Sequence, residues 1–206
     1  MFKIKGNVYM VKNRIAKVAR ATRETDIKVS VNLDGKGRYK ITTGIPFFDH
    51  MLELFSKHSL IDIDIKAVGD LKVDYHHTVE DVGLVLGDAV NNALGSRKGI
   101  LRYGWSIIPM DDASAFTAID LGGRPYVKYA VKTPTRMIRD FDLQLIEEFF
   151  RAFAVQARMN LHVCNIYGKE SHHIVEAIFK SLARSLRQAV AKDQRSSGVP
   201  SSKGVI

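Results

Sequence analysis

The chain is short of cysteine and of long apolar runs. Its 206 residues include a single cysteine, Cys164, so no disulfide can form within one chain. That usage matches the reducing cytoplasm. No apolar run approaches the roughly 18 residues of a membrane-spanning helix. Residues 1–20 also lack the apolar stretch and small-residue cleavage site of a secretory signal. We therefore predict a cytoplasmic protein without a membrane partner.

Long basic tracts are also missing, although the charge balance is basic. Lys and Arg number 31 against 22 Asp and Glu, a formal net charge of +9, and apolar residues make up 46%. This composition is ordinary for a globular domain and argues against a disordered chain. Because the basic residues are scattered, the long tail of a ribosomal or chromatin protein is excluded. Nucleic acid, a small phosphorylated anion or plain surface hydration stay open as reasons for the charge.

The hydrophobic pattern predicts an α+β fold with an internal repeat. Apolar residues that alternate predict strands, and apolar residues at 3- and 4-residue spacing predict helices. For the first half we expect strands at 27–33 and 39–41 paired as a hairpin, a helix over 47–58, a strand at 61–65 and a helix over 78–93. For the second half we expect strands at 116–121 and 127–131, a helix over 145–159, a strand at 161–166 and a helix over 173–191.

The repeat is also visible in residue identity. The motif His76-His77-x-x-Glu80 returns as His172-His173-x-x-Glu176. Two copies of one unit form a single globule when their sheet or helix faces pack together. We predict one catalytic domain over 1–206, built of two βαβ-type repeats at about 20–110 and 111–195. The polar, turn-prone segment 196–206 is either a frayed end or a tail that closes over the substrate.

The duplicated histidine pairs are the main chemical signal. On a helix, residues three and four apart share a face, so each glutamate can meet one histidine of its motif at an ion. Adjacent histidines diverge by about 100° around a helix, which suits two different ions, or one ion and a substrate. Two motifs of this kind indicate metal binding.

Two further histidines extend the predicted ligand set. His50 follows Asp49, whose carboxylate can orient the ring, and His162 lies two residues before Cys164 on a predicted strand. The predicted ligands are His50, His76, His77, Glu80, His162, His172, His173 and Glu176. They suffice for two sites of three histidines and one glutamate each. Such nitrogen-rich sites suit Mn²⁺, Fe²⁺, Ni²⁺ or Zn²⁺ rather than Ca²⁺.

Recurring cations predict a phosphate pocket beside the metals. Arg102 and Arg124 lie next to glycines, Lys180 comes four residues after Glu176, and Lys203 follows two serines. Arginine binds phosphate with two parallel hydrogen bonds, and serine hydroxyls with backbone N–H groups fill the remaining lone pairs. Each cation alone would be a hydrated surface charge. Together with a two-metal site they indicate a phosphorylated small molecule.

The order of these motifs resembles that of the imidazoleglycerol-phosphate dehydratase family. The matching stretches cover nearly the whole chain: 23–25, 47–52, 76–81, 99–104, 109–112, 120–126, 172–180 and 200–204. No phosphatase domain precedes them, so the resemblance implies the single-activity form. Two positions depart from the family: Leu54 stands where many members carry Gln, and Asp111-Asp112 replaces the commoner Asp-Glu.

The resemblance implies a ribosomal protein S5 domain 2-like fold, with helices between two sheets. It implies trimers that form a shell of 24 subunits, and two Mn²⁺ per subunit held by the eight ligands. Glu24 matches a catalytic carboxylate, with Glu176 as a second candidate for proton transfer. The residues implied at the substrate and its phosphate are Glu24, Arg102, Arg124, Lys180, Ser201, Ser202 and Lys203.

The implied reaction dehydrates imidazole glycerol phosphate to imidazole acetol phosphate in histidine biosynthesis. Two cations would favour the imidazolate, whose electrons expel the hydroxyl through a diazafulvene-like intermediate. A metal-dependent hydrolase of a phosphorylated small molecule is the rival enzyme, and product analysis separates the two because dehydration releases no inorganic phosphate. An RNA-binding α+β module is the non-enzymatic rival, although it has no need of paired His-His-x-x-Glu motifs.

Overall fold

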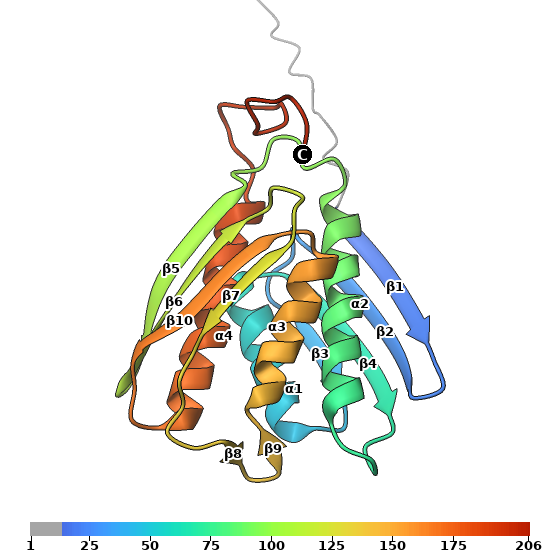
Figure 1. The fold of residues 1–206 in the computed structure, drawn as a ribbon. Helices are drawn as coiled ribbons and strands as arrows, with labels where there is room; N and C mark the ends of the chain where they lie inside the picture. Colours follow the sequence, from blue (N-terminus) through green and yellow to red (C-terminus); the bar gives the residue numbers. More distant parts are fainter. Residues whose placement is uncertain (1–13) are drawn as a thin grey trace, which may run out of the picture.

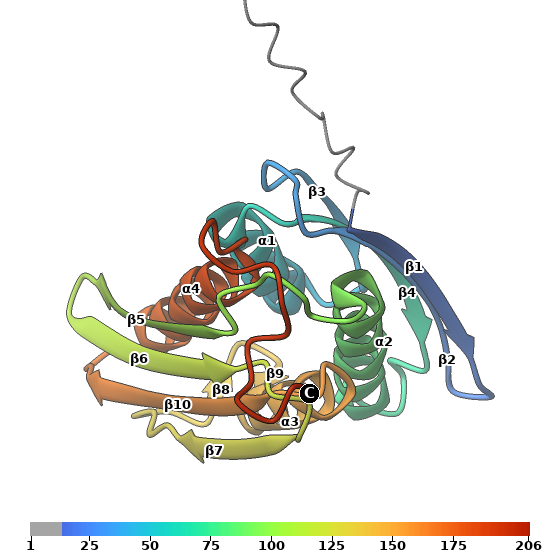
Figure 2. The same ribbon diagram turned by 90° about the horizontal axis from the view of Figure 1, so that it is seen from above.

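The computed structural model describes residues 14–206 as two sheets with four helices between them (Figure 1, Figure 2). The first half comprises β1 (Ile15–Ala21), β2 (Thr25–Asn32), β3 (Tyr39–Thr42), α1 (Pro46–Ser59), β4 (Asp62–Gly69) and α2 (His76–Leu94). The second half comprises β5 (Tyr103–Met110), β6 (Ala113–Asp120), β7 (Tyr126–Ala130), β8 (Met137–Ile138), β9 (Phe141–Asp142), α3 (Gln144–Gln156), β10 (Asn160–Tyr167) and α4 (Ser171–Val190). The predicted absence of a secretory signal concerns residues 1–20, of which 1–13 lie outside the described residues.

The two halves share one topology. The strand orders are β1-β2-β4-β3 and β5-β6-β10-β7, and in each sheet only the last pair is parallel. The small β8–β9 pair is an addition to the second half. The predicted duplicated α+β fold, with sheets packed on a helical layer, is confirmed.

The predicted hairpin between 27–33 and 39–41 is wrong. β2 pairs with β1 and β4, whereas β3 pairs with the far edge of β4. The carboxylate of Asp62, at the start of β4, accepts hydrogen bonds from the N–H groups of Lys36 (2.8 Å) and Arg38 (2.9 Å). These bonds tie the loop after β2 to β4, so the chain passes across β4 before β3 begins.

The hydrophobic pattern predicts neither β1 nor β5, the strands that start the two sheets. The predicted first repeat, about 20–110, includes β5, but β5 pairs with β6 in the second sheet. Only one face of each strand is partly covered, and the apolar alternation in β1 is interrupted by alanines and basic residues. The topological repeat therefore begins at β1 and again at β5.

The helices pack closely between the sheets. Large apolar side chains fill the interior, including Phe48, Phe149 and Phe179, and each such side chain contributes about 1.5–3 kcal/mol when fully buried. α2 approaches α3 so closely that a Cβ on Gly83 would lie 2.8 Å from the carbonyl oxygen of Phe149. A side chain there would push the two helices apart.

The direction of α2 and α4 decides where the chemistry gathers. Both helices begin at the lower end in Figure 1 and end at the top, where the C-terminal segment lies. The two His-His-x-x-Glu motifs occupy the first turns of these helices, so both lie at the lower end. Within residues 14–206, the helices are all too short or too polar to cross a bilayer.

Candidate active site

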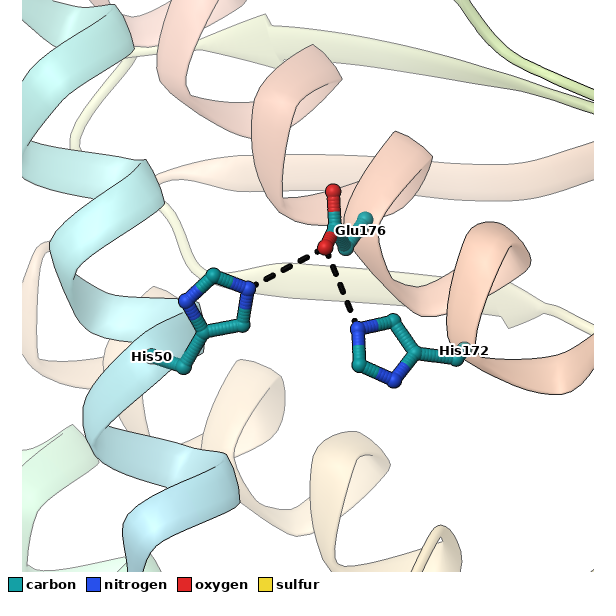
Figure 3. A group of neighbouring side chains, drawn as sticks. All are labelled: His50, His172 and Glu176. Carbon is teal, nitrogen blue, oxygen red and sulfur yellow. Dashed lines mark hydrogen bonds and ion pairs between the residues drawn. The ribbon is translucent and has the colours of Figure 1, made fainter.

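Three predicted ligands converge where α1 meets α4 (Figure 3). Nε2 of His50 and Nε2 of His172 both lie 3.1 Å from Oε1 of Glu176. The three ligand atoms lie within 4.8 Å of one another. Two imidazoles and a carboxylate aimed at one point are the donor set that divalent transition metals prefer. This group fits a metal ion.

The charge of Glu176 suits a metal ligand. Burial acts to raise the pKa of this carboxyl, but hydrogen bonds from Lys180, His50 and His172 overcome it and lower the pKa to about 2. Nζ of Lys180 lies 2.6 Å from Oε2 of Glu176. The side chain is therefore an anion at neutral pH, with one oxygen held by Lys180 and the other turned to the histidines.

The first-half motif repeats part of this arrangement. Nε2 of His76 lies 3.8 Å from Oε2 of Glu80. His172, the first histidine of the other motif, faces Glu176 in the same way. In both motifs the pair is separated by four residues, so it shares a helix face. Oε1 of Glu24, on the β1–β2 turn, lies 3.9 Å from Nε2 of His77. The helix and the turn thus bring the predicted catalytic carboxylate beside the first motif.

The second histidine of each motif has a different partner. Nδ1 of His77 lies 3.0 Å from Oδ2 of Asp70, and Nδ1 of His173 lies 2.5 Å from Oδ1 of Asp112. These hydrogen bonds raise the pKa of both histidines. The sequence pattern does not predict either aspartate as a partner of these histidines. The only signal was their position in turns, after β4 and between β5 and β6.

His162 stands apart from the other ligands. It lies on the outer face of β10, exposed, with its ring centroid 5.7 Å from that of Tyr126. The only group of three or more candidate ligands among residues 14–206 is the one around Glu176. One chain by itself therefore does not bring His162 to a metal group.

Most of the residues predicted to bind phosphate lie together at the end of the molecule opposite the group around Glu176. A pocket of about 390 Å³ is lined by Arg102, Arg124, Ser201, Ser202 and Lys203, among others. Arg102 is fixed there, because Nε and Nη2 donate to Asp120 (2.6 and 3.0 Å) and Nη1 donates to the carbonyl oxygen of Pro200 (2.8 Å). Lys180 is not in this pocket, since it pairs with Glu176.

The pocket and the metal group are far apart in one chain. The N–H of Arg102 donates to the carbonyl oxygen of Ala189, near the end of α4. Glu176 lies in the first turns of the same helix. At a rise of 1.5 Å per residue, Glu176 and Ala189 are about 20 Å apart.

Comparison with known proteins identifies the family. A sequence model described as imidazoleglycerol-phosphate dehydratase matches residues 43–186. This chain belongs to the imidazoleglycerol-phosphate dehydratase family. The dehydratase of Desulforamulus reducens is 51% identical over 194 residues, covering 94% of this chain and 99% of the relative. The dehydratase of Acetivibrio thermocellus is also 51% identical, covering 94% and 100% of the two chains.

Solved structures of the family agree with the fold. The crystal structure of imidazoleglycerol-phosphate dehydratase from Staphylococcus aureus has a TM-score of 0.79 and 36% identity, covering 86% of this chain and 99% of that one. A structure from Pyrococcus furiosus has the same TM-score with 35% identity, covering 92% and 100%. The duplicated sheet-and-helix architecture is thus that of the dehydratase family.

Leu54 is one of the two positions at which the sequence predicts a departure from the family pattern. The side chain is partly buried and packs against the hydrophobic core. A leucine at this place on α1 adds apolar packing and offers no hydrogen bond to a substrate.

Proposed function

We propose that this chain dehydrates imidazole glycerol phosphate to imidazole acetol phosphate in histidine biosynthesis, at active sites built from several copies of the chain. Family membership supports the reaction. The observation that supports shared sites is the separation of about 20 Å between the metal group and the phosphate pocket. A substrate with a three-carbon arm between imidazole and phosphate cannot reach both in one chain, so a neighbour must supply one of them.

The outer face of the second sheet supports the assembly. Trp105 and Ile107 of β5 are mostly exposed, and His162 lies on the same face two strands away. Apolar side chains gathered on one open face mark a contact surface. We propose that another copy covers this face, that trimers build a shell of 24 subunits, and that His162 thereby reaches a metal group of its neighbour.

The ligand groups support two divalent cations per chain, Mn²⁺ by the family resemblance. His50, His172 and Glu176 would hold one ion, and His76 with Glu80 would hold the other. His77, His173 and His162 would complete the two coordination shells across subunit contacts. When bound, the two cations supply positive charge that favours the deprotonated form of the substrate's imidazole ring.

The remaining residues divide the work of binding and proton transfer. Glu24, exposed on its turn near His77, is placed to exchange a proton with the substrate arm. Glu176 is the weaker candidate for that task, because a pKa of about 2 leaves it unprotonated and committed to Lys180 and two histidines. Lys180 would support the substrate from the metal end rather than from the pocket of its own chain.

Phosphate binding falls to Arg102, Arg124, Ser201, Ser202 and Lys203. The segment 196–206 lies against this pocket, where the N–H of Gly99 donates to the carbonyl oxygen of Gly198. We propose that this segment closes over bound substrate as part of a single catalytic domain spanning 1–206. We also propose a cytoplasmic location, which rests on the single cysteine in the sequence.

Incubating the Mn²⁺-loaded protein with imidazole glycerol phosphate tests the function directly. Dehydration yields the acetol phosphate and no inorganic phosphate, whereas a metal-dependent hydrolase releases phosphate. Detection of phosphate without the acetol product would refute the dehydratase assignment. Failure of both products to appear in a protein that binds Mn²⁺ would also contradict it.

A further inference from the structure

The two aspartates that hold His77 and His173 are anchored in unequal ways. Oδ1 of Asp112 faces Nδ1 of His173 at 2.5 Å, while Oδ2 accepts from the N–H groups of Lys169 (2.7 Å) and Glu170 (3.0 Å). Both oxygens of Asp112 are therefore fixed. Asp70 differs, because Oδ2 faces Nδ1 of His77 at 3.0 Å but the buried Oδ1 has no hydrogen-bond partner among residues 14–206.

A carboxylate on Nδ1 determines which ring nitrogen is free. An ionised carboxylate only accepts hydrogen bonds, so Nδ1 must carry the ring proton and Nε2 keeps its lone pair. Nε2 is then the nitrogen that can bind a metal. In both histidines Nε2 points away from the anchoring aspartate, toward Glu24 (3.9 Å) for His77 and toward Asp111 (3.6 Å) for His173.

We propose that Asp70 and Asp112 are positioning residues that fix the tautomer of His77 and His173, and that Asp112 imposes its choice more strictly. Neither aspartate is placed to touch the metal. The inference rests on the proposed role of the two histidines as metal ligands. It assigns to each half of the chain one carboxylate that keeps Nε2 open for the ion.

Substitution by asparagine should have different effects at positions 70 and 112. In Asp112→Asn, the amide oxygen must take the position of Oδ2 and accept from the N–H groups of Lys169 and Glu170. An NH₂ group in that position would face two other donors. The NH₂ group then faces His173 and donates to Nδ1, so the ring proton moves to Nε2 and blocks the metal-binding nitrogen. At 70, no donor fixes the amide, so its oxygen can stay on His77 and preserve the open Nε2.

Titration of the assembled, metal-free full-length protein with Mn²⁺ tests this, with free Mn²⁺ measured by its electron paramagnetic resonance signal. The unmodified protein should bind two ions per chain. Asp112→Asn should weaken one of the two by about 10–100-fold, the usual cost of losing such a carboxylate. Asp70→Asn should cost less than about tenfold. Asp112→Glu keeps an acceptor on Nδ1 and should retain most of the affinity.

Asp112→Ala gives a readout that mere loss of structure would not produce. It removes the acceptor without donating to Nδ1, so it should bind Mn²⁺ more tightly than Asp112→Asn. Asp26→Asn is the matched control, because it removes one exposed negative charge whose ion-pair partner is Lys28, at 3.9 Å. This variant should bind Mn²⁺ as the unmodified protein does. Circular dichroism and particle size confirm that each variant folds. If Asp112→Asn does not fold, the contrast between Asp112→Ala and Asp112→Glu decides.

Equal affinities for Asp112→Asn and the unmodified protein would overturn the inference. So would Asp112→Ala binding more weakly than Asp112→Asn, or Asp112→Glu losing as much affinity as Asp112→Ala. An unmodified protein that binds no Mn²⁺ would instead refute the proposed metal sites, so the two failures are distinct.

Discussion

The two sheets have the same topology, but their outer faces differ in character. On the first sheet the outward positions include Lys17, Lys28 and Asp64, which are hydrated charges. On the second sheet the corresponding row runs through Trp105, Ala118 and His162. The inward faces of both sheets pack on helices and stay apolar. The inward faces of the two halves are therefore alike, whereas the outward faces differ, with charged side chains on the first sheet and exposed apolar side chains on the second.

In contrast to the outer faces, the first turns of α2 and α4 are alike in the two halves. There the two halves agree, because each motif turns its first histidine to a glutamate four residues on and its second histidine to an aspartate. His50 adds a third ligand in only one of these groups. The geometry of the two motifs is therefore duplicated, while the pocket lined by Arg102 and Lys203 belongs mainly to the second half.

The largest effect is expected from a charge placed on the second outer face. Ile107→Asp would bury an unpaired carboxylate wherever another copy covers this surface, at a cost of several kcal/mol. The assembly should dissociate, and activity should fall to background because no active site is complete. Light scattering measures the particle size, with product assays beside it.

Ser30→Asp is the matched control on the first outer face. Ser30 pairs with Lys17 on β1 and with Asp64 on β4, which are both exposed, so the new charge stays hydrated beside one charge of each sign. Particle size should not change. Dissociation by both variants, or by neither, would remove the distinction between the two faces.

The next effect concerns the agreement between the halves. His172→Ala and His76→Ala should each remove one Mn²⁺ per chain and each lower kcat by at least about 100-fold, since a catalytic cation contributes several kcal/mol. Metal analysis of the purified variants, together with kcat, checks this. Full occupancy by two ions in either variant would contradict the assignment of its motif.

The pairing of histidine with glutamate within each His-His-x-x-Glu motif could be predicted from sequence because it depends on local geometry. A histidine and a glutamate four residues apart share a helix face in any fold, so the pairing of His172 with Glu176 follows from spacing alone. Apolar alternation and helical spacing likewise located α1, α2, α3 and α4 to within a few residues. The resemblance to the dehydratase family supplied the reaction, which spacing alone left open.

What could not be predicted depends on long-range packing. The turn glycines after β2 indicated a hairpin, but β4 takes the place beside β2, and no local signal shows that. The roles of Asp70 and Asp112 also depend on turns folding back onto helix starts. His162 lies exposed on β10, outside the group around Glu176, and no local signal in the sequence shows that separation.

A smaller effect is expected at the phosphate pocket, which has no counterpart in the first half. Deleting Pro200–Ile206 should raise KM by about 10–100-fold, because one charge-assisted contact to phosphate contributes about 1.5–3 kcal/mol. Arg102→Ala should act in the same direction, since Arg102 holds both Asp120 and the carbonyl of Pro200. Metal content and particle size should stay unchanged. Unaltered kinetics in the truncated protein would exclude the segment from substrate binding.

The smallest effect is a pH dependence in which both halves should behave alike. The hydrogen bond to Asp70 raises the pKa of His77, and that to Asp112 raises the pKa of His173. A histidine must lose its extra proton to bind a metal. As the pH is lowered, the Mn²⁺ affinity should therefore start to decrease at a pH above the ordinary histidine pKa of about 6.5. The decrease should be about tenfold per pH unit for each proton that competes with the metal.

The metal-free protein should show the opposite trend. A histidine whose pKa is raised by folding stabilises the folded state below its unfolded pKa, and this contribution disappears as the pH rises through the folded pKa. Lowering the pH from 8 toward 6 should thus weaken Mn²⁺ binding while the two histidine–aspartate pairs gain strength in the absence of metal. Mn²⁺ titrations and thermal unfolding of the metal-free protein over this range measure the two trends. Affinity that is flat from pH 8 to 5 would exclude histidine ligation in both halves, because protons would then have no competing site.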